Sequence, residues 1–293
     1  MREVPADAAR VFDDTACGLG EGPLWHPGRQ CLYWFDIDGR RLHWRGETGA
    51  GSHGFERTVT AAGVVDDDAL LVASDVGLLR LDLDSGRHET VREVEADDPA
   101  TRSNDGRADP HGGFWFGTMG RGAEPGAGAI YRYFRGELRR LHANVTIPNS
   151  ICFAADGRTA WFSDTHERRV MRQRVDERDG WPLGEPETWL DFADADRKPD
   201  GAVTDAEGTL WIAFWGEGCM DGYDVDGRHA ARVRLPTANV TCPAFGGEGL
   251  DRLYCTSATL GLEEDARRAQ PHAGATFEVD VGARGRPEPV VAL

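Results

Sequence analysis

The chain has 293 residues, of which 40% are hydrophobic and 28% charged, ordinary values for a globular protein. Its formal net charge of −17 argues against nucleic acid as a partner, because a polyanion is bound by clustered lysine and arginine side chains. The same charge disfavours an anionic membrane surface, and no apolar run approaches the ~20 residues of a membrane-spanning helix. We therefore expect neither a nucleic-acid nor a membrane partner, and a single domain over residues 1–293.

The cysteines and the N-terminal segment predict a cellular compartment. Residues 1–10 lack the apolar stretch of a signal peptide. The six cysteines are scattered and form no C-x-x-C pair. In a chain of this length without a signal peptide, such cysteines are typically reduced and mostly buried. We expect a cytoplasmic protein.

A short aromatic-rich segment recurs six times along the chain, and each copy has the composition of a β-strand. In chain order the copies are 32–36 (LYWFD), 70–74 (LLVAS), 114–118 (FWFGT), 160–164 (AWFSD), 210–214 (LWIAF) and 253–257 (LYCTS). Their second residues are separated by 38, 44, 46, 50 and 43 positions. A turn precedes each copy, and a second alternating run follows it after a gap. This pattern predicts one antiparallel sheet per repeat.

Sheets that repeat about every 45 residues are typical of propeller blades, so the sequence predicts an all-β, six-bladed β-propeller. No helical periodicity competes over a long window, although residues 262–269 are compatible with a turn or two of helix. A propeller must close into a ring, and the strand-like residues 9–13 could supply the missing edge strand of the last blade. A series of β-sandwiches or two smaller domains is the alternative. The unbroken repeat and the lack of a linker favour the propeller.

Polar residues occupy one phase of this repeat in four of the six copies. Glu21 and Asn149 lie 12 positions before the aromatic residue of their copies, and Asn104 and Asp200 lie 11 positions before theirs. In a propeller, this phase falls on the segment that enters the first strand, which runs closest to the ring axis. We therefore expect these four side chains to converge on the mouth of the central channel.

Glu21, Asn149 and Asp200 together form an oxygen-rich ligand set. Two carboxylates and one amide suit Ca²⁺, Mg²⁺ or Mn²⁺, and Zn²⁺ or Fe²⁺ is also compatible. Three protein ligands leave positions for water and substrate, which is typical of a catalytic rather than a structural metal. Taken singly, Asp and Asn beside Gly or Pro are most often turn residues. Their shared phase favours a divalent metal site.

The motifs around these residues resemble those of the SMP-30/gluconolactonase/regucalcin family, over residues 18–279. They are Gly20-Glu21-Gly-Pro-x-Trp25, Ser103-Asn104-Asp105-Gly106 with Gly117-Thr118-Met119, Pro148-Asn149-Ser, and Pro199-Asp200-Gly. The resemblance implies a six-bladed propeller with one divalent metal held by Glu21, Asn149 and Asp200. It also implies that Asp200 is the catalytic acid/base, that Arg102 and Asn104 bind substrate, and that Glu124 is a further substrate contact. Within the family, the chain is similar to bacterial xylono- and arabinolactonases.

The resulting hypothesis is a metal-dependent hydrolase of a small sugar lactone, either a pentono- or a hexonolactone. The metal would polarise the lactone carbonyl, and Asp200 would activate the attacking water. Two alternatives stay open. One is a calcium-binding or scaffolding propeller without catalysis, and the other is a metal-dependent hydrolase of phosphotriesters or aromatic lactones. Arg102 and Asn104 favour a hydroxylated substrate over an apolar one.

Overall fold

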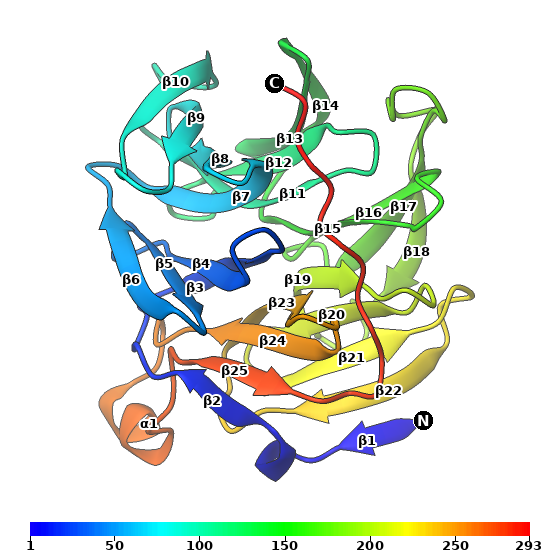
Figure 1. Cartoon of the computed structure of the whole chain (residues 1–293). Helices are drawn as coiled ribbons and strands as arrows, with labels where there is room; N and C mark the ends of the chain where they lie inside the picture. The colour runs from blue at the N-terminus through cyan, green and yellow to red at the C-terminus, as the bar shows by residue number, and fades with distance from the viewer.

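Each repeat of the sequence folds as one antiparallel sheet in the computed structural model, which describes residues 1–293. Six such sheets are arranged as the blades of a β-propeller (Figure 1). Blade one consists of β3 (Gly20–His26), β4 (Cys31–Asp36), β5 (Arg41–Gly46) and β6 (Gly49–Gly54). Blade two consists of β7 (Val59–Asp66), β8 (Ala69–Ser74), β9 (Gly77–Asp82) and β10 (His88–Glu93). Blade three consists of β11 (Thr101–Ala108), β12 (Phe114–Gly120), β13 (Gly128–Phe134) and β14 (Glu137–Val145). Blade four consists of β15 (Pro148–Phe153), β16 (Thr159–Asp164), β17 (Arg169–Arg174) and β18 (Glu187–Asp191).

The last two blades also use strands from the N-terminus. Blade five consists of β19 (Pro199–Thr204), β20 (Leu210–Phe214), β21 (Cys219–Tyr223) and β22 (His229–Arg234), with the N-terminal β1 (Arg2–Val4) at its edge. Blade six consists of β23 (Val240–Gly246), β24 (Arg252–Ser257) and β25 (Thr276–Val279), with the N-terminal β2 (Arg10–Asp13) at its edge. The two helical turns are η1 (Ala6–Ala8) and α1 (Glu264–Ala269). Both the predicted closing strand and the predicted short helix are therefore confirmed. No helix is long and apolar enough to cross a membrane.

The recurring aromatic segment forms the second strand of every blade, where both faces of the sheet are covered. All residues of β8, β12 and β20 are buried, which explains why these segments are continuous apolar runs rather than alternating ones. In blades three and five the central tryptophan also donates its indole N–H to an aspartate six positions earlier. Trp115 bonds to Asp109 at 3.2 Å and Trp211 to Asp205 at 3.0 Å. These bonds tie the end of the first strand to the core.

The first strands of the blades surround the central channel. Each of these strands packs against the next one, and β23 packs against β3, so the ring is closed. All six run in the same direction around the axis. Their first residues therefore lie at one end of the channel and their last residues at the other.

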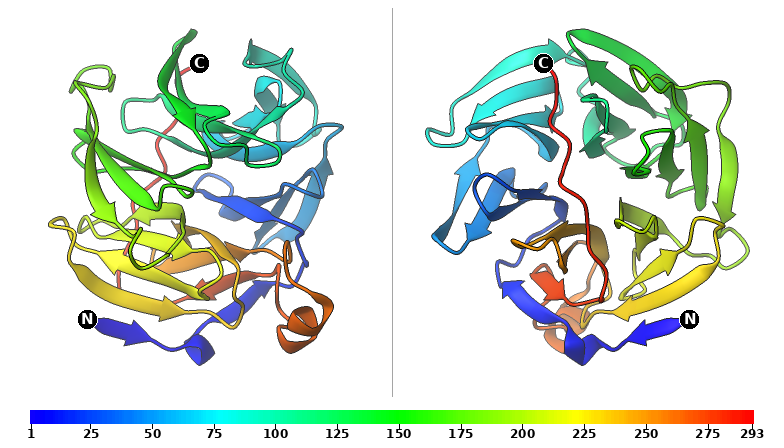
Figure 2. Two further views of the ribbon diagram at one scale, coloured as in Figure 1. Left: turned by 180° about the vertical axis from the view of Figure 1, so that it is seen from behind. Right: turned by 45° about the vertical axis from the view of Figure 1, so that its right-hand side comes forward.

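The C-terminal segment, residues 281–293, crosses the far end of the ring (Figures 1 and 2). Arg286 donates to the carbonyl of Phe153 at 2.7 Å, and Ala292 donates to the carbonyl of Gly112 at 2.8 Å. Glu288 forms an ion pair with Arg107 of β11 at 2.6 Å, and both side chains are about nine-tenths buried. The segment thereby closes the channel at the end of the first strands.

Replacing Glu288 with Gln should destabilise the protein strongly. The substitution leaves the buried Arg107 guanidinium without its counter-charge, and breaking such a pair costs about 3–5 kcal/mol. Glu137, which pairs with Arg139 at the exposed surface, is the matched control. Glu137→Gln should hardly change stability, because exposed ion pairs contribute little. Urea unfolding of both variants measures the difference, and equal midpoints would show that the Glu288–Arg107 pair does not stabilise the fold.

Candidate metal centre

The four residues at the shared phase lie within the first strands and not just before them. In blades one, three, four and five, the register of the first strand shifts directly after or at this position. The shifts fall between Glu21 and Leu24, Ser103 and Gly106, Asn149 and Cys152, and Pro199 and Ala202. Such a β-bulge leaves residues unpaired and re-aims their side chains. The bulge therefore turns these polar side chains into the channel.

The residues that follow the candidate ligands show how tightly the bulges are built. Gly22 has a φ of +53°, which favours glycine, and Ser150 adopts a similar φ of +55°. Gly201 follows Asp200, and a Cβ atom at this position would lie 2.3 Å from the Cys242 Sγ atom. The backbone conformation therefore favours glycine at position 22, after Glu21, and the lack of space for a side chain favours glycine at position 201, after Asp200.

The bulges bring the predicted residues to one cavity of about 440 Å³ at the channel mouth. Glu21, Arg102, Asn104, Asn149 and Asp200 all line it. The other lining residues come from neighbouring segments; they are Leu19, Met119, Ile147, Thr165, His166, Arg168, Lys198, Trp215 and Leu260. The cavity volume lies within the ~300–1,000 Å³ of small-molecule sites.

A chain of hydrogen bonds orients the amide side chains across three blades. Arg102 donates to the Asn104 Oδ1 atom at 2.9 Å, and Asn104 Nδ2 donates to the Asn149 Oδ1 atom at 3.1 Å. Asn149 Nδ2 donates to the Thr165 hydroxyl at 2.8 Å, which in turn donates to the carbonyl of Pro199 at 2.7 Å. The hydrogen bond from Asn149 Nδ2 to Thr165 fixes the orientation of the amide, so that the Asn149 Oδ1 atom faces Asn104 on the other side.

A repeated aspartate fixes the segments that lead into two of the bulges. In blade four, the Asp164 carboxylate accepts the backbone N–H groups of Thr146, Ile147 and His166 at 2.7, 3.0 and 3.0 Å. In blade one, Asp36 stands at the same phase of the repeat and accepts the N–H of Leu19 at 3.1 Å. These carboxylates hold the backbone that carries the cavity wall.

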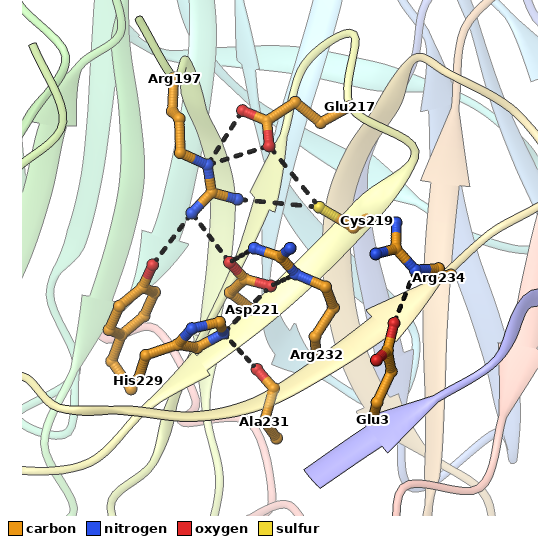
Figure 3. Close-up of polar contacts among 10 residues, drawn as sticks. Glu3, Arg197, Glu217, Cys219, Asp221, His229, Ala231, Arg232 and Arg234 are labelled. Carbon is orange, nitrogen blue, oxygen red and sulfur yellow. Dashed lines mark hydrogen bonds and ion pairs between the residues drawn. The ribbon is translucent and has the colours of Figure 1, made fainter. Parts of the chain in front are cut away.

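In blade five, Arg197 holds the segment that leads to Asp200 (Figure 3). Its guanidinium pairs with the fully buried Asp221 at 2.8 Å and with Glu217 at 2.9 Å, and it stacks on the Phe214 ring at 3.6 Å. Asp221 also accepts two bonds from Arg232, at 2.7 and 2.8 Å. This network of ion pairs around the buried Asp221 fixes the backbone three residues before Asp200.

The two candidate carboxylate ligands are buried and form no ion pair. Burial, together with the nearby Asp105 carboxylate, raises the pKa of Glu21 to about 8. Burial also raises the pKa of Asp200 well above its usual range, with the Glu21 and Asp105 charges adding to this effect. Two buried acids that repel each other, beside an amide oxygen, fit a divalent cation, which would offset both charges.

Asp105 is a third acidic side chain in this region that the sequence analysis did not single out. Its carboxylate accepts the N–H groups of Gly106 and Ile151, both at 2.8 Å, and burial raises its pKa. Arg107 stands two residues later on the same strand, and its positive charge partly offsets the rise in the pKa of Asp105. The signal was present, because Asp105 directly follows Asn104 at the ligand phase.

Glu124 is not brought to the cavity with the other predicted residues. It lies exposed on the loop between β12 and β13, and its carboxylate accepts the N–H of Gly122 at 3.1 Å. The loop turns back on itself through residues 120–128, so its acidic side chain is held by its own backbone. Among the lining residues that the sequence analysis missed are His166, Lys198 and Trp215.

The fold and the cavity define a propeller with an acidic, metal-competent channel. The chain belongs to the SMP-30/gluconolactonase/LRE-like family, whose model matches residues 19–259. It is 40% identical to the L-arabinolactonase of Azospirillum brasilense over 93% of this chain and 92% of the relative. It is 38% identical to the pentonolactonase XacC of Haloferax volcanii over 94% and 95% of the two chains. The crystal structure of a calcium-binding protein, regucalcin, from Agrobacterium tumefaciens is 43% identical, with a TM-score of 0.97 over 100% of both chains.

The metal-free protein should lose stability as the pH rises from about 4.5 to about 8, the ordinary and the folded-state pKa of Glu21. In this window the unfolded chain has released a proton that the folded state still holds. Each pH unit therefore lowers the free energy of unfolding by about 1.4 kcal/mol for such a group. Urea unfolding of chelator-treated protein at several pH values measures the slope. Glu21→Gln should flatten it and Glu137→Gln should not; an unchanged slope in Glu21→Gln would contradict the assignment.

Proposed function

We propose that this protein hydrolyses a sugar lactone, a pentono- or hexonolactone, to the aldonic acid, with a divalent cation held by Glu21, Asn149 and Asp200. The observation that carries the proposal is the pair of buried carboxylates without a counter-ion, set at the floor of a cavity of about 440 Å³. The names of two relatives point the same way, since they are lactonases of pentonolactone and L-arabinolactone. The identity of the metal among Ca²⁺, Zn²⁺, Fe²⁺, Mn²⁺ and Mg²⁺ is a matter for experiment.

When bound, a divalent cation at this site supplies Lewis-acid polarisation of the lactone carbonyl and offsets the negative charge that develops on its oxygen. Asp200 has the surroundings of a general base, because its buried carboxylate has a raised pKa and thus a high proton affinity. It would take a proton from the attacking water and return it to the ring oxygen as the carbon–oxygen bond breaks. Water is consumed and one carboxylic acid and one hydroxyl are formed.

The chain's other residues would bind and orient the sugar. Arg102 presents its guanidinium donors to the cavity, and its hydrogen bond to the Asn104 Oδ1 atom fixes the geometry of both side chains. Asn104 Nδ2 is itself engaged by the Pro148 carbonyl and by Asn149, so Asn104 orients its neighbours. Met119, Ile147 and Trp215 offer apolar wall against which the carbon face of a sugar ring packs. This mixture of a few fixed polar groups with apolar wall is typical of small-molecule sites.

A binding protein without catalysis is the second candidate, and the likeness to a structure described as a calcium-binding regucalcin is the observation that favours it. A purely structural ion would not require a substrate-sized cavity above it. The presence of Arg102, whose guanidinium faces that cavity without a carboxylate partner, favours lactone hydrolysis.

Asp200→Asn should reduce lactone turnover by about a hundred- to ten-thousandfold, the usual contribution of a general acid/base. Acid release from a panel of aldonolactones, on protein reloaded with each of five metals, measures this loss. The matched control is Asp194→Asn on the exposed loop before β19, which should keep full activity. Metal content of both proteins separates loss of the base from loss of the ion. Turnover by Asp200→Asn near that of Asp194→Asn would refute the role of Asp200.

A further inference from the structure

Basic side chains gather on the wall of the cavity although the protein as a whole is strongly acidic. The chain has 50 acidic residues against 33 lysines and arginines, yet the cavity is lined by more basic than acidic side chains. The basic ones are Arg102, His166, Arg168 and Lys198, and the acidic ones are Glu21 and Asp200. On a surface of net charge −17, such a reversal of sign marks a site that attracts negative charge.

Of the three arginine and lysine side chains in the cavity, two have no acidic partner. Arg168 pairs with Asp196 at 2.7 Å and is thereby neutralised. Arg102 donates only to the carbonyl of Ser103 and to the Asn104 side chain, at 2.8 and 2.9 Å. Lys198 is the only lysine in the chain, and its ammonium group forms no ion pair.

The charges of the cavity can be balanced residue by residue. A divalent cation would offset Glu21 and Asp200, and the third buried acid, Asp105, has Arg107 on its own strand. Arg102 and Lys198 remain as arginine and lysine side chains of the cavity without an ion-pair partner. Hydrolysis of a neutral lactone produces a single carboxylate. Arg102, hydrogen-bonded to Asn104 beside the candidate ligands, is placed to bind that carboxylate. Lys198 is then left as a cation of the cavity that is used neither by the candidate ligands nor by the product carboxylate.

Lys198 is held at the opening of the cavity rather than at its floor. Its side chain is exposed, whereas Glu21, Asn149 and Asp200 are buried. Its carbonyl accepts the N–H of Trp215 at 3.0 Å, and Arg197 beside it is fixed by the network around Asp221. The backbone that carries the ammonium group is therefore held in place, and the exposed group is available to the part of a substrate that does not enter among the buried candidate ligands.

We propose that the substrate is a lactone that carries an anionic group of its own on the terminal carbon, and that Lys198 binds this group. The inference rests on the proposed lactonase function and narrows its substrate class. A terminal carboxylate, phosphate or sulfonate shares the required chemistry. An exposed ammonium–anion pair contributes about 0.2–1 kcal/mol, which corresponds to a preference of up to about fivefold.

The experiment compares lactones that differ only at the terminal carbon. They are D-gluconolactone, the same lactone phosphorylated on its terminal hydroxyl, and D-glucarolactone, whose terminal carbon is a carboxylate. We expect kcat/KM to be about fivefold higher for one of the charged lactones, and the arms show which anion is preferred. In Lys198→Gln, the ratio of charged to neutral kcat/KM should fall toward unity through KM, and Lys198→Arg should restore it.

Arg87→Gln is the matched control, because it removes one positive charge from an exposed turn away from the cavity. It should leave the ratio unchanged, which separates local binding from the effect of net charge. A wild-type protein that prefers the neutral lactone, with Lys198→Gln slowing all lactones equally, would overturn this inference and leave the lactonase function standing. Hydrolysis of neither these three lactones nor a pentonolactone would overturn the proposed function itself.

Discussion

Closing six sheets into a ring forces like charges together in the channel. Glu21, Asp105 and Asp200 come from three different blades, and each has a pKa raised first by burial. Carboxylates that are buried and close to one another resist ionisation, and a divalent cation bound between them would relieve their repulsion. The same closure that provides the core of the protein therefore also brings together the acids of the proposed metal site.

The surroundings of these acids are arranged at both ends of the channel. At the mouth, Arg102 orients Asn104 and so the amide of Asn149. At the far end, Arg107 lies below Asp105 and is itself paired with Glu288 of the C-terminal segment. Because Glu288 compensates Arg107, the guanidinium does not repel a cation in the channel as strongly as an unpaired one would. The C-terminal segment thus contributes to the electrostatics of the centre as well as to closure.

Sequence periodicity was sufficient to predict the six blades, because the second strand of each blade is buried on both faces and must be apolar. It was also sufficient to bring Glu21, Asn149 and Asp200 to one cavity, since residues at one phase of a closed repeat must meet near the axis. Their roles as ligands stay predictions. The bulges that aim these side chains were not predicted, because they depend on hydrogen bonds between strands. The position of Glu124 outside the cavity lining could not be predicted for a related reason, since its loop has no repeat phase to fix its position.

Sequence periodicity could not predict the positions of residues that contact the site but do not belong to the shared part of the repeat. Residues 281–293 form no blade, and their contacts with β7, β11 and β15 depend on where the ring places those strands. Lys198 stands two residues before the ligand-phase Asp200, where blade three has Arg102 before Asn104 but blades one and four have Leu19 and Ile147. A repeat explains what the blades share, whereas selectivity for one substrate must come from what a single blade has alone. The side chains of blade five around Asp200 are therefore where differences in substrate among proteins of this fold are to be sought.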